Sequence, residues 1–381
     1  MSTKSKILIL VDWFAPGYRA GGPIQSCVNV AFALKDQYRI MVFTSDTDYG
    51  VNEPYPDILS NQWVNDLDPS IDVYYSRKSS LSLKQIKEIV AGTDADFVYL
   101  NHLFSPKFVV YPLWLKWRSV IKGKVVVCPR GALYESALSV KRYKKMPFLK
   151  LFKWMGIHKK VRFHATNERE QKAILDYFPG SEVLIADNLP NSRQPAFSFL
   201  PKEKGTVKCI FIARIHPIKN LLFLLKALTP VKSQVSLTVI GPVEDENYWG
   251  KCKSQIAILP DNISVNYLGA KPNHELIIFL QNHHLFILPT TGENFGHSIF
   301  ESFLAGRPVL ISDQTPWLRL QEQYTGWDLP LGNAEAFTVA IETAAAWDQQ
   351  VFDQCSYAAW QYAKKFIENP VLKQQYLQLF S

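Results

Sequence analysis

Two glutamates, Glu293 and Glu301, lie eight positions apart in the second half of the 381-residue chain. The segment that holds them, PTTGENFGHSIFE at residues 289–301, follows an apolar run and leads into a helix-like pattern. A carboxylate offers two acceptor oxygens, so the loop glutamate suits sugar hydroxyls and the helix glutamate suits a ribose diol. The amides around Phe295 and Gly296 would open the helix and face an anion. The alternative is a helix-capping acid with an incidental surface acid.

Two permanent cations, Arg214 and Lys219, follow the apolar run at 209–213. A nucleoside diphosphate gains negative charge on its leaving oxygen as the bond to a sugar breaks. Arginine and lysine stabilise that charge where no metal ion does so. The two cations therefore predict a metal-independent diphosphate site, and the alternative is two solvated loop side chains.

A glycine-containing loop follows the first apolar run, with Gly21 and Gly22 directly before Pro23 and a helix-like pattern. Glycines let the backbone approach a phosphate closely, and a helix start supplies free N–H groups. The loop has neither a GxGxxG fingerprint nor a Walker lysine, so dinucleotide and P-loop sites are excluded. The alternative is a plain turn between a strand and a helix.

Short apolar runs alternate with helix-like patterns along the whole chain. Most runs are apolar at every position, which is typical of parallel strands buried on both faces, and the alternation indicates an α/β fold. A proline-containing segment at 187–204 separates two series of runs. We therefore expect two doubly wound domains, at residues 1–190 and 191–355. The expected strands are residues 7–11, 39–44, 73–75, 97–100, 125–128, 161–164, 208–213, 236–240, 264–267, 285–288 and 309–311.

The chemically suggestive loops all follow expected strands. Ligands of open α/β sheets bind at the carboxyl ends of the strands. With two such sheets we expect the site in a cleft between the domains.

The positive charge is concentrated in one stretch. The chain has a formal net charge of +8, yet residues 136–167 contain nine cations and no acid. Apolar side chains at 148, 151, 152 and 155 share one side of a helix there, with Lys150 and Lys153 opposite. Such a helix predicts contact with an anionic membrane surface through residues 141–162, or with an anionic acceptor. The alternative is a surface helix that packs its apolar side on the domain. No nucleic-acid motif accompanies the stretch, so we expect no nucleic-acid partner.

Composition supports a folded protein, with 47% hydrophobic and 20% charged residues. No apolar run approaches the roughly 18 residues that a membrane span needs. The polar start of the chain lacks the features of a secretory signal, and five scattered cysteines form no zinc or disulfide spacing. We therefore expect a cytoplasmic protein, peripheral on the inner face of the cell membrane, without a metal site.

The order of these residues resembles family 4 of the retaining glycosyltransferases, which have the GT-B fold of two Rossmann-like domains facing across a cleft. The two glutamates match the E-x7-E motif of that family, the two cations match its diphosphate-binding pair, and the glycine loop matches its N-terminal loop. Four strings are similar to a bacterial branch that builds surface polysaccharides. They are PRGAL at 129–133, HAT at 164–166, ENFG at 293–296 and TPW at 315–317.

The resemblance implies roles for matching positions. Glu293 would bind hydroxyls of the donor sugar, with the amides of Asn294, Phe295 and Gly296 beside it. Glu301 would bind the ribose. The glycine pair at 21 and 22 would also belong to the donor site.

The resemblance also implies roles for the first half of the chain. His102 matches a histidine near the reacting sugar, and its alternative is a capped loop histidine. Arg130 would contact the acceptor or a phosphate. A final helix at 356–381 would return to the first domain. The linker departs from the family's PNG string, because Ser192 stands where glycine is common.

The expected activity is metal-independent, cofactor-free transfer of a hexosyl or N-acetylhexosaminyl group, with retention, from a UDP- or GDP-linked donor. The expected acceptor is a lipid-linked or other glycan of a bacterial surface polysaccharide or lipopolysaccharide. A sugar-nucleotide epimerase of the same fold and a non-catalytic nucleotide-sugar-binding subunit are the alternatives. A metal-dependent GT-A enzyme is a further rival, because DxD strings begin at residues 46, 66 and 94.

Overall fold

The computed structural model describes residues 4–139, 141–191 and 195–381 and divides the chain into two compact units. The first unit comprises Met1–Leu189 and Asn369–Ser381, and the second comprises Pro190–Glu368. Ser192, at which the linker departs from the family string, lies outside the described residues.

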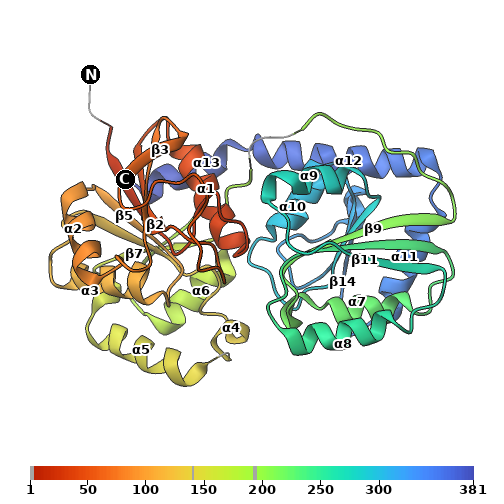
Figure 1. Cartoon of the computed structure of the whole chain (residues 1–381), viewed down its shortest axis with the longest axis horizontal. Coiled ribbons are helices and arrows are strands. Elements are labelled where there is room, and N and C mark those ends of the chain that lie inside the picture. The colour runs from red at the N-terminus through yellow and green to blue at the C-terminus, as the bar shows by residue number, and fades with distance from the viewer. Residues whose placement is uncertain (1–3, 140, 192–194) are drawn as a thin grey trace. The chain divides into compact units, whose positions relative to one another are not determined.

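The first unit is built on an eight-stranded sheet of order β3-β4-β2-β1-β5-β6-β7-β8 (Figure 1). Neighbouring strands are parallel except for β3 and β4, which are antiparallel. Ile7–Leu10 of β1 are fully buried, as expected of a central strand covered on both faces. The strands are β1 (Lys6–Leu10), β2 (Arg39–Ser45), β3 (Trp63–Asp68), β4 (Ile71–Ser76), β5 (Phe97–Asn101), β6 (Lys124–Cys128), β7 (Arg162–Ala165) and β8 (Glu182–Ile185).

Helices cover both faces of this sheet, with α2, α3 and α5 on one face and α1 and α13 on the other (Figure 1). The helices are α1 (Gly22–Leu34), α2 (Leu83–Thr93), α3 (Tyr111–Trp117), α4 (Glu135–Ser139), α5 (Arg142–Trp154), α6 (Glu168–Tyr177) and α13 (Pro370–Leu379), with short turns η1 (Pro106–Val110) and η2 (Ile157–Lys159).

The second unit has a six-stranded parallel sheet of order β11-β10-β9-β12-β13-β14. Helices α7 and α8 lie on one face, and α9, α10 and α12 lie on the other (Figure 1). The strands are β9 (Thr206–Ile212), β10 (Gln234–Ile240), β11 (Ile263–Tyr267), β12 (Leu285–Leu288), β13 (Val309–Ser312) and β14 (Gly326–Leu329). The helices are α7 (Leu221–Leu228), α8 (Glu246–Ile256), α9 (Asn273–Gln281), α10 (His297–Leu304), α11 (Ala334–Ala346) and α12 (Gln349–Ile367), with short turns η3 (Pro217–Lys219) and η4 (Gln321–Gln323).

Both sheets reverse their strand order once. In the second sheet the chain order reads 3-2-1-4-5-6, so the reversal lies between β9 and β12. In the first sheet the corresponding reversal lies between β1 and β5. The α/β class and the two Rossmann-like sheets that the sequence predicts are confirmed, and each sheet has one topological switch point where ligands of such folds bind.

Three strands were not predicted: β3, β8 and β14. All three lie at an edge of their sheet. An edge strand has one unpaired side and need not be apolar on both faces, so it lacks the continuous apolar run that marks a central strand. The sequence WVNDLD of β3 is an example, since its middle residues are exposed.

The chain returns to the first unit at Asn369, whose side chain caps the start of α13. Helix α12 belongs to the second unit. The return is therefore carried by α13 alone, rather than by the whole segment 356–381.

The basic helix α5 packs its apolar side on the first unit. Leu149 and Phe152 are buried in the core, and Phe148 and Met155 pack against it. Leu151, which the sequence assigns to the same apolar side, is 52% exposed. The interpretation of that side as a free membrane-binding face is therefore wrong, because the sheet already covers it.

Candidate functional site

The two predicted cations of the second unit lie at its switch point. Arg214 comes two residues after β9, and Lys219 ends the short turn η3 that follows. The loop at residues 289–296 follows β12, the strand on the other side of the reversal. The strand order therefore brings together two segments that are more than seventy residues apart in the chain.

Both cations are ion-paired. The ammonium of Lys219 pairs with the carboxylate of Glu293, and each of these side chains is 15% exposed. Arg214 donates to Oε2 of Glu244 at 2.5 Å, and Glu244 lies in the loop after β10. The strand neighbouring β9 thus supplies an acid that the sequence analysis did not single out. In the sequence, Glu244 is recognisable only as an acid that follows an expected strand. It indicates a partner for Arg214 only once β10 is known to lie beside β9.

Backbone and hydroxyl contacts fix the two loops to each other. The carbonyl of Ile218 accepts from the amide of Thr291 at 2.8 Å and from the hydroxyl of Thr290 at 3.0 Å. The amide of Glu293 donates to the carbonyl of Gln314 at 3.0 Å. These contacts hold Lys219 and Glu293 on a common support, so neither side chain depends on the other alone for its position.

Gly296 is the N-cap residue directly before helix α10 and has a left-handed conformation, with φ of 78°. A Cβ atom at this position would lie 2.7 Å from Cδ1 of Ile299, which is closer than real Cβ contacts. The carbonyl of Gly296 accepts from the amides of Ile299 at 2.9 Å and Phe300 at 3.1 Å, which closes the first turn of α10. The positive φ therefore favours glycine at this position.

Phe295 is 7% exposed, and its ring packs against Trp317 with centroids 5.1 Å apart. The indole of Trp317 donates to the carbonyl of Phe295 at 2.5 Å. The side chain of Phe295 is thus part of the core, and only its backbone is available to a ligand. Asn294 precedes it in the same loop.

Glu301 lies in the second turn of α10. Burial raises the pKa of its carboxyl to about 8, although a hydrogen bond with Asn273 lowers it. The group is thus mainly a neutral acid near pH 7, able to donate as well as accept a hydrogen bond. Asn273 opens α9 and is a second residue that the sequence analysis did not identify.

The glycine loop of the first unit follows β1 at the switch point of its sheet. Gly21 has φ of 67° and precedes Gly22, the first residue of α1. The carboxylate of Asp48 accepts from the amides of Tyr18 at 2.9 Å and Arg19 at 3.1 Å. Asp48 belongs to one of the DxD strings, and here it orders the glycine loop.

His102 follows β5, on the other side of the same reversal, and its φ is 81°. Non-glycine residues in this region are strained, and such strain is typical of functional loops. Its Nδ1 accepts from the amide of Phe104 at 3.2 Å, which leaves Nε2 as the protonated nitrogen. Burial, together with the charge of Lys145, lowers the pKa of His102 to about 4. The imidazole is thus a neutral hydrogen-bond donor near pH 7.

Arg130 follows β6 with φ of 55°. Its guanidinium donates to Oδ1 of Asn101 at 2.9 Å, to the hydroxyl of Tyr99 at 3.0 Å, and to Asn188. Asn188 lies just before the start of the second unit. Three donors of Arg130 are therefore used within the first unit, where they hold the chain next to the linker.

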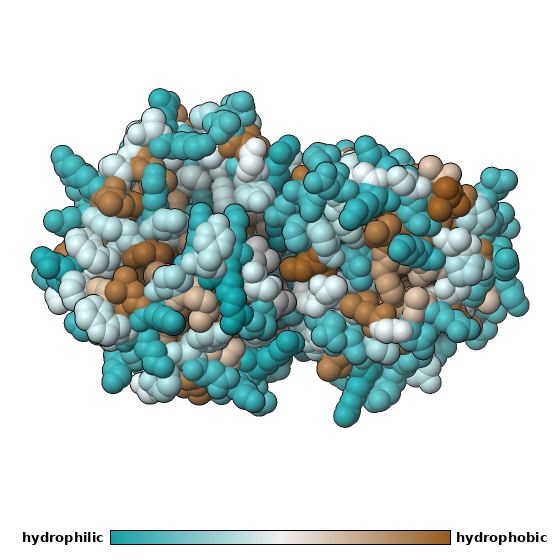
Figure 2. Space-filling view, turned by 90° about the horizontal axis from the view of Figure 1, so that it is seen from below, coloured by the Kyte–Doolittle hydropathy of each residue, from teal (hydrophilic) through white to brown (hydrophobic). Residues whose placement is uncertain are grey.

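The outward side of α5 carries both apolar and basic side chains. Tyr143, Leu151 and Trp154 are 72%, 52% and 83% exposed, and their spacing places them on one stripe of the helix. Lys144, Lys150 and Lys153 beside them are exposed too. Figure 2 looks from below onto the side where α5 lies in Figure 1, and shows isolated apolar groups among hydrophilic ones.

No helix among the described residues is both long enough and apolar enough to cross a membrane. Within residues 4–139, 141–191 and 195–381, no three His, Cys, Asp or Glu side chains gather where they could hold a metal ion.

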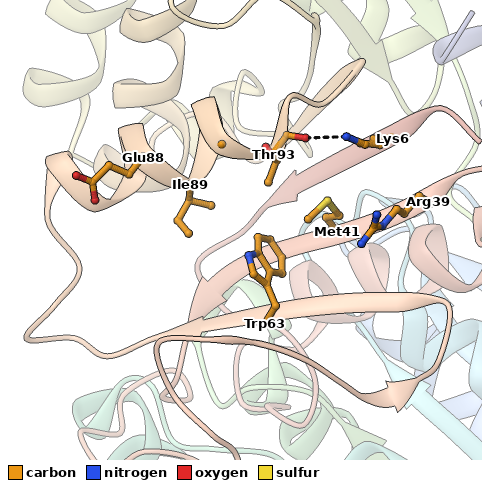
Figure 3. Close-up of a pocket in the computed structure, with 8 residues that line it drawn as sticks. Lys6, Arg39, Met41, Trp63, Glu88, Ile89 and Thr93 are labelled. Carbon is orange, nitrogen blue, oxygen red and sulfur yellow. Dashed lines mark hydrogen bonds between the residues drawn. The ribbon is translucent and has the colours of Figure 1, made fainter.

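A cavity of about 360 Å³ lies at the other end of the first sheet. Lys6 and Arg39, the first residues of β1 and β2, line it together with Trp63 of β3 and residues of α2 (Figure 3). Lys6 donates to the carbonyl of Thr93 at 3.3 Å. The cavity lies at the amino ends of the strands and contains none of the predicted site residues.

One family model matches part of the second half of the chain. Residues 192–357 match the family model for glycosyl transferases group 1, a match that covers most of the second unit and none of the first. No curated protein sequence matches the chain significantly.

Solved structures match nearly the whole chain. Anabaena HepE in complex with UDP and glucose has a TM-score of 0.71 at 17% identity, with 98% of each chain covered. Sucrose-phosphate synthase from Thermosynechococcus elongatus has a TM-score of 0.70 at 15% identity, over 99% of this chain and 98% of that chain. WaaG, a glycosyltransferase involved in lipopolysaccharide biosynthesis, has a TM-score of 0.61 at 11% identity, with 98% of each chain covered. The fold is GT-B. The fold that the sequence predicts by resemblance is thus confirmed.

Proposed function

We propose that this protein is a retaining glycosyltransferase of family 4 that transfers a hexosyl or N-acetylhexosaminyl group from a UDP- or GDP-linked donor to an acceptor hydroxyl. One observation carries the proposal. Arg214, Lys219 and the loop with Glu293 meet at the switch point of a group 1 glycosyltransferase unit. The complexes of HepE with UDP and with UDP-glucose support a nucleotide-sugar donor.

The donor would bind along the carboxyl ends of β9 and β12. Arg214 and Lys219 would hold the diphosphate, while the amides at the start of α10 would face an anionic oxygen. Glu293 would accept hydrogen bonds from sugar hydroxyls, and Glu301 would bind the ribose diol. Because Lys219 pairs with Glu293, donor binding would redistribute that pair between phosphate and sugar.

The chemical step would need no protein nucleophile. As the bond from the anomeric carbon to the phosphate oxygen breaks, the two cations would stabilise the charge left on the phosphate. That oxygen would take the proton of the acceptor hydroxyl, which attacks on the same face and retains the anomeric configuration. His102 would donate from Nε2 to the reacting sugar, in keeping with its neutral state. No metal ion or other cofactor enters this scheme.

We further propose that the acceptor is a lipid-linked glycan of a bacterial surface polysaccharide, including lipopolysaccharide. The protein would then be cytoplasmic and peripheral on the inner face of the cell membrane, in contact through residues 141–162. The exposed lysines of α5 and the stripe of Tyr143, Leu151 and Trp154 support this contact, because basic residues attract anionic lipids and aromatic residues favour the interface. The similarity of the fold to WaaG supports the pathway.

The deciding experiment is a donor screen with the purified protein. UDP- and GDP-sugars are first ranked by thermal shift, since a bound ligand raises the apparent stability. The best donor is then incubated with a glycan acceptor, with and without EDTA. Sugar transfer that persists in EDTA supports the proposal. Free epimer without transfer would indicate the epimerase. Donor binding without any turnover would indicate the non-catalytic subunit, and loss of transfer in EDTA would contradict metal independence.

A further inference from the structure

One lysine of the basic helix α5 turns inward. Lys144, Lys150 and Lys153 are exposed, whereas Lys145 is partly buried. Its ammonium donates to the carbonyl of Ala137 at 2.6 Å and lies 5.2 Å from the centroid of the Phe104 ring. Lys145 therefore points toward the loop after β5, at the carboxyl ends of the strands.

This position is beside His102. Phe104 donates its amide to Nδ1 of His102 at 3.2 Å, and the two rings lie 6.1 Å apart. Phe104 also packs against Phe148 of α5, with centroids 5.8 Å apart. The positive charge of Lys145 contributes to the lowered pKa of His102, which is a second sign that the two groups are near each other.

The charge of Lys145 lacks a carboxylate partner among the described residues. The nearest acid along the chain, Glu135, pairs with Arg142 instead. On the neighbouring strand end, Asp12 accepts from the hydroxyl of Ser105, and burial raises its pKa. An ammonium has three donors, and one of them bonds Ala137. A partly buried cation without a carboxylate partner is stabilised by an anion that enters from solution.

We propose that Lys145 is an acceptor-binding residue whose ammonium binds a phosphate or diphosphate group of the acceptor, next to His102. The inference rests on the proposed function and specifies its acceptor as phosphate-bearing. The ring of Phe104 and the carbonyl of Ala137 both contact the ammonium, so these two contacts position the charge. The same helix would then have two roles, with its outward stripe on the membrane and Lys145 on the anionic group of the acceptor.

Two sources could supply this anionic group: the diphosphate that joins a glycan to its lipid, or a phosphate on a sugar of the glycan. The kinetic test therefore uses three acceptors with the same terminal sugar. One is linked to a polyprenyl diphosphate, one is a soluble sugar phosphate, and one is a neutral glycoside. Wild-type protein is expected to prefer at least one phosphate-bearing acceptor over the neutral glycoside by about tenfold or more in kcat/KM.

The test variant is Lys145→Met, which keeps an unbranched apolar side chain and removes the charge. Its matched control is Lys84→Met, because Lys84 is 85% exposed and lies on another helix of the same unit. Lys145→Met is expected to lose the preference, through a higher KM for the phosphate-bearing acceptor, while KM for the donor stays the same. Lys84→Met is expected to keep the preference for the phosphate-bearing acceptor.

A preference that Lys145→Met retains in full would overturn the proposal. Loss with the lipid-linked acceptor alone would identify the lipid diphosphate as the source.

A binding experiment separates this inference from the proposed function. Inorganic pyrophosphate is titrated into the wild-type protein, and the imidazole signal of His102 is followed by NMR after assignment with His102→Asn. The signal is expected to shift in a saturable manner, and the shift is expected to be lost in Lys145→Met but not in Lys84→Met. If no acceptor is ever glycosylated, the proposed function fails, yet this titration still decides on the anion site. An unmoved signal in the wild type would overturn the site.

Discussion

Lys219 and Glu293 pair with each other across the switch point of the second sheet, although the sequence assigns them to different parts of one ligand. Arg214 pairs likewise with Glu244. Both side chains that are predicted to bind phosphate are thus paired with acids. An anionic donor must therefore compete with these carboxylates, which makes the ion pairs part of the binding equilibrium.

Arg214→Ala and Lys219→Ala should each abolish most sugar transfer. Each change removes a charge that would stabilise the leaving diphosphate, and losses of this kind amount to about 100-fold or more in kcat/KM. Glu293→Ala should do the same by removing the ligand of the sugar hydroxyls. Turnover of the donor and UDP binding by calorimetry provide the measurement. Lys226→Ala is the control, because Lys226 is exposed on α7 in the same unit. Wild-type turnover in all three variants would remove the site assignment.

Glu244→Gln should strengthen UDP binding. The glutamine cannot form the ion pair that occupies Arg214, so the guanidinium is available to the diphosphate without an exchange of partners. The pair is partly exposed, which limits the expected gain to about two- to fivefold in Kd at low salt. The gain should fall as salt is added, since screening weakens the competing pair in the wild type as well. Calorimetry at two salt concentrations measures this, and weaker UDP binding would show that Glu244 instead positions Arg214.

The site residues that directly follow a strand could be predicted from the sequence. Arg214, Glu293, Gly21 and His102 each follow an apolar run, and the structure places each at a switch point of its own sheet. The acid that pairs with Arg214 was not predictable in the same way. Glu244 lies thirty positions away, and only the side-by-side pairing of β9 and β10 brings it to Arg214.

Hydrogen-bond partners that depend on tertiary packing could not be predicted from the sequence either. Arg130 stands out in the sequence as an isolated cation after a strand. Its contacts depend on Tyr99 and Asn101 of β5 and on Asn188 near the linker. The packing of the basic helix α5 was likewise not predictable from the sequence. Its apolar residues were visible, but periodicity alone did not show which of them face the sheet.

Gly296→Ala should destabilise the second unit and impair donor binding. An alanine at φ of 78° costs about 1–2 kcal/mol, and its Cβ would also displace Ile299 at the start of α10. Gly292→Ala is a matched control in the same loop, because no atom lies within 4 Å of its added Cβ and its φ is not positive. Thermal unfolding and UDP affinity are measured for both variants. Equal effects of the two changes would contradict the conformational requirement at Gly296.

Glu301→Gln should change how stability depends on pH. The pKa of Glu301 is raised in the folded state, from 4.5 to about 8. Between these values the unfolded chain has released the proton while the folded chain still binds it, so the free energy of unfolding falls as the pH rises. Above about pH 8 no further loss arises from this group. Denaturant unfolding from pH 5 to pH 9 should show a smaller decline in the glutamine variant. An identical decline in both proteins would show that the pKa of Glu301 is not raised.

Membrane contact through α5 should depend on charge and on the outward apolar stripe. Each lysine near an anionic surface contributes about 1 kcal/mol, so replacing Lys144, Lys150 and Lys153 by glutamine should weaken binding about 100-fold. Replacing Leu151 and Trp154 by serine should weaken it further at high salt, where the electrostatic part is screened but burial of apolar surface is not. Co-sedimentation with vesicles of phosphatidylglycerol and phosphatidylcholine provides the measurement.

The control for the apolar change is Ile258→Ser, because Ile258 is 69% exposed in the second unit. Loss of binding in the lysine variant alone would indicate that α5 stays above the headgroups and does not insert its stripe. Unchanged binding in both variants would remove the membrane contact altogether. Sugar transfer to a water-soluble acceptor should be the same in every one of these proteins, because the replaced side chains are exposed, whereas Lys145 is partly buried beside Phe104.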